Sequence, residues 1–137
     1  MRFGRYECIG ELASGGMGTV YLGRAVGEGG FERLVALKVM HPHLAKDEKF
    51  RHMFLDEARL AAGVRHPNVV ATIDVQRVDD AIFLVMDYVE GPTLHALRRH
   101  HSAQAQTIPL GPMLRIMIDA LHGLQAAHEL CDEHGNP

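Results

Sequence analysis

The stretch L-A-S-G-G-M-G-T-V-Y, at positions 12–21, constrains the fold most strongly, because it places three glycines between two strand-like segments. Residues 5–12 precede the glycines, and residues 19–26 follow them with β-branched and aromatic side chains typical of a strand. Glycine suits a flexible hairpin tip, and it equally suits a loop whose backbone N–H groups close over an anion. A dinucleotide-binding enzyme is set aside, because its glycine loop leads into a helix rather than into a strand.

The rest of the chain predicts a mixture of strands and helices. A third strand is expected at residues 32–40, and a helix at 47–63 that ends at a glycine. After a turn at His66-Pro67-Asn68, two apolar, β-branched runs are expected to form a hairpin. The later expectations are strands at 69–75 and 81–86, a short helix at 94–99 capped by Thr93, a polar linker at 101–109 and a helix at 112–130.

Length and charge narrow the class of protein. The 137 residues suit one small domain with a core, and a formal charge of -3 gives no case for nucleic acid or an acidic membrane as partner. No apolar run approaches the ~18 residues of a membrane span, and no apolar signal segment opens the chain. Cys8 and Cys131 form no motif, which indicates reduced thiols and a cytoplasmic location.

Lys38 is the first candidate functional residue. Alternation along the third strand puts Lys38 on the same face as Ala36, while Leu37 and Val39 point the other way. A lysine on a solvated strand face is common, so a functional lysine and a merely solvated one stay equally open at this stage.

Glu57 is the second candidate, because it interrupts an apolar stripe of the helix expected at 47–63. At 3.6 residues per turn, that stripe consists of Phe50, Met53, Phe54, Leu60, Ala61 and Val64. A carboxylate among core-facing side chains is costly unless a cation meets it, and Lys38 is the obvious partner. A lysine held in this way is suited to binding a phosphate.

Five motifs follow one another along the chain: the glycine-rich hairpin, the V-A-L-K strand, the helix with its inward glutamate, H-P-N-V-V and L-V-M-D-Y-V-E-G-P-T-L. In this order they resemble the amino-terminal lobe of eukaryotic-like Ser/Thr protein kinases. The segment G-G-M-G-T-V-Y is most similar to the sequences of the bacterial members of that family. The resemblance implies an α+β fold, with a five-stranded antiparallel sheet and one main helix, followed by two helices of an incomplete helical lobe. It places the amino-terminal lobe at residues 1–91 and the partial second lobe at 92–137.

The resemblance also assigns roles around ATP, the cofactor it implies. Gly15, Gly16 and Gly18 match the loop over the phosphates, although Ala13 replaces the first glycine of the pattern. Lys38 matches the lysine that holds the α- and β-phosphates, and Glu57 matches its helix partner. The remaining matches are Val20 and Ala36 around the adenine, Met86 as gatekeeper, and the backbone of Asp87 and Val89 as hydrogen-bonding groups for the adenine.

The catalytic groups of the family have no match in these residues. Kinases follow the helix expected at 112–130 with an H-R-D-x-x-x-x-N loop and then D-F-G, whereas this chain reads C-D-E-H-G-N-P. The absent Asp is the base that accepts the hydroxyl proton, and the absent Asn and D-F-G Asp hold Mg²⁺. The chain alone is therefore expected to position ATP without efficient phosphoryl transfer, and a non-catalytic nucleotide-binding or interaction module is the alternative.

Two further features complete the expectations. The helix at 112–130 carries an apolar stripe of Leu114, Met117, Ile118, Leu121 and Leu124, which suggests self-association unless the helix folds back onto the chain. The ten histidines form no recognised metal motif, since His128-Glu129 does not continue as H-E-x-x-H, so no metal site is expected. The identity of the protein substrate is not encoded in any of these patterns.

Overall fold

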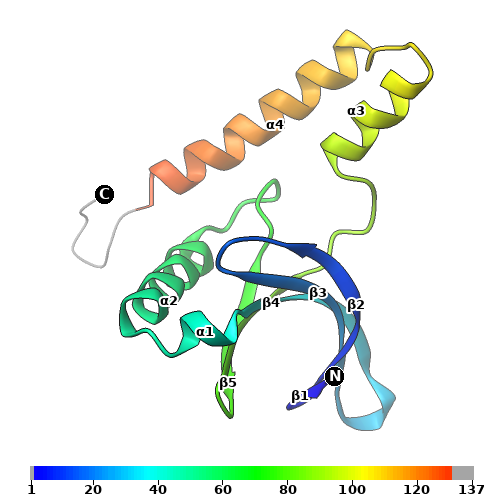
Figure 1. The fold of residues 1–137 in the computed structure, drawn as a ribbon. Coiled ribbons are helices and arrows are strands. Elements are labelled where there is room, and N and C mark those ends of the chain that lie inside the picture. The colour runs from blue at the N-terminus through cyan, green and yellow to red at the C-terminus, as the bar shows by residue number, and fades with distance from the viewer. Residues whose placement is uncertain (1, 131–137) are drawn as a thin grey trace. The chain divides into compact units, whose positions relative to one another are not determined.

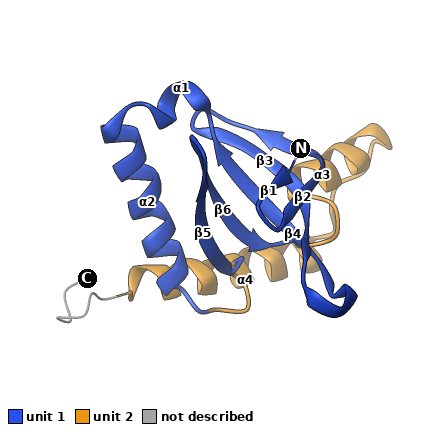
Figure 2. Cartoon of the chain, turned by 90° about the horizontal axis from the view of Figure 1, so that it is seen from below, with its two compact units in different colours: residues 1–65, 70–88 blue, residues 66–69, 89–137 orange. Residues whose placement is uncertain are grey.

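The computed structural model describes residues 2–130, which divide into two compact units. Figure 2 colours the described residues of the first unit, 2–65 and 70–88, in blue, and those of the second, 66–69 and 89–130, in orange. The chain therefore crosses from one unit to the other more than once, because residues 66–69 belong with the later helices. The domain boundary after residue 91 stays a prediction.

The first unit is built on one curled antiparallel sheet (Figure 1). The six strands lie in the order β1-β2-β3-β4-β6-β5. Their bounds are β1 Arg2–Phe3, β2 Tyr6–Ser14, β3 Gly18–Val26, β4 Glu32–Met40, β5 Thr72–Val78 and β6 Ala81–Asp87. The expected α+β fold is confirmed, and the expected count of five strands is corrected, because a two-residue strand such as β1 has no alternation pattern to reveal it.

Two α-helices and one short 3₁₀ helix, η1 (Glu28–Gly30), accompany the sheet among the described residues of the first unit. Helix α2 (Glu48–Gly63) begins where the sequence predicts, because the Asp47 carboxylate accepts a hydrogen bond of 2.9 Å from the N–H of Lys49. The short helix α1 (Pro42–Ala45), opened by a proline at its first position, was not predicted from the sequence.

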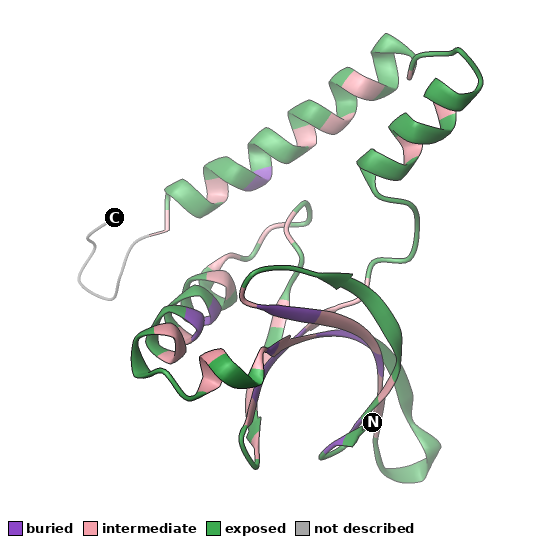
Figure 3. Ribbon diagram, viewed as in Figure 1, coloured by how far each residue is buried: buried purple, intermediate pink, exposed green. Residues whose placement is uncertain are grey.

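The two faces of the sheet bury two separate clusters. Figure 3 colours the buried segments of the strands and of α2 purple. One cluster consists of Phe3, Tyr6, Val35, Leu37, Phe83 and Val85. The other joins α2 to the sheet through Met40, Phe54, Ala58, Ile82 and Leu84. Alternation along β4 and β6 produces this division, because successive side chains point to opposite faces.

The apolar stripe predicted for α2 is only partly correct. Phe54 and Ala58, four residues apart, are fully buried, whereas Met53 and Leu60 are exposed. The helix therefore contacts the sheet mainly through Phe54 and Ala58, with Leu55 partly buried beside them. The apolar stripe predicted for α2 is wider than the surface that the sheet buries, because the hydrophobicity of the residues does not reveal how much of the helix the sheet covers.

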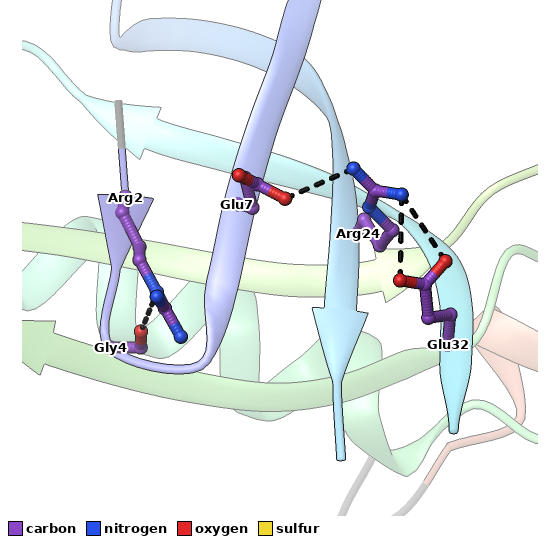
Figure 4. Close-up of polar contacts among 5 residues, drawn as sticks. All are labelled: Arg2, Gly4, Glu7, Arg24 and Glu32. Carbon is purple, nitrogen blue, oxygen red and sulfur yellow. Dashed lines mark hydrogen bonds and ion pairs between the residues drawn. The ribbon is translucent and has the colours of Figure 1, made fainter. Parts of the chain in front are cut away.

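Solvent-exposed ion pairs of one arginine connect three neighbouring strands (Figure 4). Arg24 of β3 lies 3.1 Å from Glu7 of β2 and 3.2 Å from Glu32 of β4, between Nη atoms and carboxylate oxygens. These carboxylates, Glu32 foremost, raise the pKa of the Arg24 guanidinium. Because solvent-exposed ion pairs add little to stability, their effect here is to favour this register.

Cys8, on β2, is partly buried against the first cluster. Burial raises the pKa of its thiol, so the thiol stays protonated at neutral pH. Cys131, the other cysteine of the sequence, lies outside the described residues.

The described part of the second unit contains two helices. Helix α3 (Leu94–Ala103) is capped by Thr93, as predicted, but it continues four residues beyond the expected end at 99. Helix α4 (Leu110–His128) packs against the H-P-N segment, where the Asn68 side chain donates a hydrogen bond of 2.9 Å to the carbonyl of Asp119. A Cβ at Gly123 would lie 3.1 Å from the carbonyl of Asn68, so the glycine permits this close approach.

The apolar stripe predicted for α4 is exposed. Leu114, Met117, Ile118, Leu121 and Leu124 each keep about half of their surface in solvent. Among the described residues, no helix has both the length and the apolar character that crossing a membrane requires.

Candidate functional site

The structure brings Lys38 and Glu57 together. The Nζ of Lys38, on β4, lies 2.5 Å from Oε1 of Glu57, on α2, and 5.8 Å from the centroid of the Phe54 ring. Packing of α2 on the sheet through Phe54 and Ala58 sets this distance, because Glu57 is the neighbour of Ala58 on the helix. The ion pair therefore depends on the tertiary contact rather than on either element alone.

The expected burial of Glu57 is wrong. Its side chain is 47% exposed, against 23% for Lys38, because Glu57 lies beside the part of α2 that the sheet buries, which is centred on Phe54 and Ala58. An ion pair with this exposure contributes little to the free energy of unfolding. The ion pair acts instead by fixing the position of the lysine, since the Glu57 carboxylate holds the ammonium group of Lys38 in one place.

A cavity of about 380 Å³ adjoins this lysine. It is lined by Ala13, Ser14, Gly15, Gly16, Met17, Gly18, Val20 and Lys38. Three glycines, a valine and the lysine head predicted for one site thus share one cavity of the first unit. Lys38 faces Val20 in the register of β3 and β4, which explains why these two residues meet.

The glycine loop is closed at its base and open at its tip. The N–H of Gly15 donates a hydrogen bond of 2.9 Å to the carbonyl of Gly18, and Ser14 and Thr19 contact each other through their hydroxyls at 3.1 Å. Within the described residues, no acceptor meets the N–H groups of Gly16 and Met17. Backbone N–H groups of this kind are suited to an anionic ligand.

Packing distinguishes two of the glycines. A Cβ at Gly18 would lie 2.2 Å from the carbonyl oxygen of Val39, because β3 approaches β4 closely there, whereas a Cβ at Gly16 would meet nothing within 4 Å. Gly18 is therefore required by the sheet itself, and Gly16 is not required by packing.

We expect Gly18→Ala to destabilise the fold by about 1–3 kcal/mol, because the backbone of β3 or β4 must move to admit the methyl group. Gly16→Ala is the matched control and should change stability by less than about 0.5 kcal/mol. Urea unfolding followed by circular dichroism measures both values. Equal destabilisation by the two substitutions would contradict the close approach at Gly18.

The residues predicted around the adenine are less closely grouped. Ala36 is buried on β4, the strand that carries Lys38, and it pairs with Met86 of the neighbouring strand β6. The N–H of Asp87 donates a hydrogen bond of 3.0 Å to Ala71, so only its carbonyl remains for a ligand, and its carboxylate pairs with Arg33. Val89 is exposed and belongs to the second unit.

His41 is a residue of this region that sequence reasoning missed. Its Nε2 lies 2.9 Å from the carbonyl oxygen of Gly15, and its backbone N–H donates a hydrogen bond of 3.1 Å to the carbonyl of Met17. No sequence signal indicates this contact, because it depends on the register that pairs Gly18 with Met40.

In the part of the chain that the structure describes, no group of three or more His, Cys, Asp or Glu side chains could hold a metal ion. These described residues therefore do not fit a Mg²⁺ site by themselves.

Comparison with known proteins identifies the family. Residues 6–134 match the sequence pattern of the protein kinase domain. The chain is 38% identical over 135 residues to a protein named tyrosine-protein kinase MasK from Myxococcus xanthus, covering 98% of the chain and 21% of that protein. It is 39% identical over 128 residues to the probable serine/threonine-protein kinase pknA2 from Bifidobacterium longum, covering 91% of the chain and 16% of that protein.

Solved structures agree with the sequence relatives. The kinase domain of PknI from Mycobacterium tuberculosis superimposes with a TM-score of 0.70 at 31% identity, covering 94% of this chain and 49% of that domain. The chain thus spans about half of a solved kinase domain and about a fifth of its curated relatives. The match over residues 6–134 confirms the resemblance found in the sequence, and the chain belongs to the protein kinase family.

Proposed function

We propose that this chain forms the ATP-positioning part of a bacterial Ser/Thr protein kinase domain. In this proposal Lys38 binds the α- and β-phosphates, Glu57 holds the lysine head, and the loop of Gly15, Gly16 and Gly18 covers the phosphates. Val20, Ala36 and Met86 surround the adenine, and the carbonyl of Asp87 and the N–H of Val89 supply its hydrogen bonds.

The observation that carries the proposal is the position of the Lys38 head. It is held by Glu57 beside a cavity lined by the glycine loop, and that loop has N–H groups without acceptors among the described residues. A cation and backbone donors around one cavity suit the polyphosphate of a nucleotide. Among the described residues that line the cavity, Lys38 is the charged one, and it offers a cation to a negatively charged ligand.

In this proposal the chain binds and orients ATP but does not transfer its phosphate. The base that accepts a hydroxyl proton and the residues that hold Mg²⁺ in this family have no match among the 137 residues. Phosphoryl transfer to a protein hydroxyl would therefore need residues that this chain does not supply. We retain the cytoplasm as the proposed location, because the cysteines form no disulfide motif.

Two measurements on the 137-residue chain test the proposal. We expect saturating ATP to raise the melting temperature, because a ligand that binds only the folded state stabilises it. We expect no transfer of labelled phosphate to protein substrates carrying serine, threonine or tyrosine. An unchanged melting temperature would refute nucleotide binding, and efficient transfer would refute the confinement to positioning. Transfer to tyrosine alone would also refute the Ser/Thr assignment.

The exposed stripe of α4 favours a second candidate function, a non-catalytic interaction module. Leu114, Ile118 and Leu121 leave a helix face half in solvent, and contiguous apolar surface of this kind marks contact sites. We expect the chain to self-associate through this face, which sedimentation velocity at several concentrations would detect. Leu121→Glu should then restore the monomer, and a wild-type chain that stays monomeric throughout would refute this proposal.

A further inference from the structure

We propose that His41 is a positioning residue of the nucleotide loop, which it holds through the carbonyl of Gly15. The inference rests on the proposed function, since it concerns how the same cavity is prepared for ATP. It starts from the 2.9 Å contact between Nε2 of His41 and the carbonyl oxygen of Gly15. Because a carbonyl oxygen only accepts, Nε2 carries the hydrogen and donates it.

The backbone of His41 is fixed on both sides. Its N–H donates to the carbonyl of Met17 at 3.1 Å, and its carbonyl accepts from the N–H groups of Leu44 at 2.9 Å and Ala45 at 3.0 Å. Pro42 follows as the first residue of α1 and restricts the chain further. The imidazole is therefore presented to the loop from a constrained point at the end of β4.

The ring itself has a neighbour that limits its rotation. The imidazole of His43 stacks on that of His41, with centroids 5.5 Å apart and ring planes 14° from parallel. Gly15, in contrast, has no side chain, and its N–H is already bonded to the carbonyl of Gly18 at 2.9 Å. Both backbone polar groups of Gly15 are thus engaged, one by Gly18 and one by His41.

The consequence for the ligand follows from the geometry of the peptide bond. The carbonyl of Gly15 and the N–H of Gly16 belong to one peptide unit, and in a trans peptide these two groups point in opposite directions. Fixing the carbonyl on His41 therefore fixes the direction of the Gly16 N–H. That N–H has no acceptor among the described residues, and Gly16 lines the cavity beside Lys38.

Fixing the Gly16 N–H before the ligand binds has a large effect in a glycine-rich loop, because glycine loses more backbone freedom than any other residue when it is ordered. If His41 orders the loop before the nucleotide arrives, less of that freedom is lost on binding. We therefore expect His41→Ala to raise the dissociation constant of ATP by about three- to tenfold, the effect of losing one neutral hydrogen bond and its ordering.

Titration calorimetry with ATP on the 137-residue chain tests the inference. His41→Gln places an amide N–H at a similar reach and should recover most of the lost affinity, whereas His41→Ala should not. His52→Ala, which removes an exposed histidine from α2, is the matched control and should leave the dissociation constant unchanged. A His41→Ala chain that binds ATP as tightly as the wild type, or more tightly, would overturn the inference.

Nuclear magnetic relaxation of the backbone nitrogens separates this inference from the proposed function. In the nucleotide-free chain, we expect His41→Ala to lower the order parameters of Gly15 and Gly16 from rigid values toward those of a flexible loop, and His41→Gln to restore them. Unchanged order parameters would overturn the role of His41 even if the chain binds ATP. A wild-type chain that fails to bind ATP would refute the proposed function, whatever the relaxation shows.

Discussion

Replacing Lys38 by Met is expected to weaken ATP binding by about ten- to a hundredfold, which is the largest effect we expect on ligand binding. Met keeps most of the apolar stem and removes the ammonium group. A hydrogen bond to a charged group contributes about 1.5–3 kcal/mol, and each ~1.4 kcal/mol changes a dissociation constant tenfold. Titration calorimetry measures the loss, and the stabilisation of the chain by ATP should disappear in parallel.

The control for this prediction is Lys49→Met, the same substitution at an exposed position of α2. It should bind ATP as the wild type does, apart from a small change in the overall charge. The nucleotide-free Lys38→Met chain should melt close to the wild type, because the ion pair with the half-exposed Glu57 adds little stability. Equal ATP affinity in Lys38→Met and the wild type would contradict the role of Lys38.

Replacing Phe54 by Ala is expected to cost about 3–5 kcal/mol of folding free energy, the largest effect on stability. The ring is 1% exposed and packs with Met40, Ala58, Ile82 and Leu84, so the truncation leaves a cavity between α2 and the sheet. Since small domains are stable by about 5–15 kcal/mol, the loss is a large fraction of the total. Urea unfolding followed by circular dichroism gives the value, because the chain has no tryptophan to report by fluorescence.

Two further variants serve as the control and as a milder truncation for Phe54→Ala. Phe31→Ala removes the same ring from an exposed position and should change the free energy of unfolding by less than about 1 kcal/mol. Phe54→Leu retains part of the volume and gives a measurable value if the alanine variant does not fold. A loss below about 1 kcal/mol for Phe54→Ala would mean that α2 does not pack on the sheet as described.

Local patterns in the sequence were enough to predict most elements of the fold. The glycine run between two strand-like segments predicted a hairpin, and β4 was predicted with its observed bounds because its alternation is clear. Asp47 marked the start of α2, and Thr93 marked the start of α3. Strand β1 and helix α1 were missed, because two or four residues are too few to carry a periodic signal.

The sequence alone determined the fold class, the family and the identity of the residue types around the cavity. The fold class, the family and these residue types depend on local propensity and on the order of motifs, and both are properties of the sequence itself. Only the tertiary structure decided that Glu57 is half exposed, that Gly18 is required by the carbonyl of Val39, and that His41 reaches the carbonyl of Gly15. Each of these depends on how closely two distant segments approach, and that distance is set by packing and strand register.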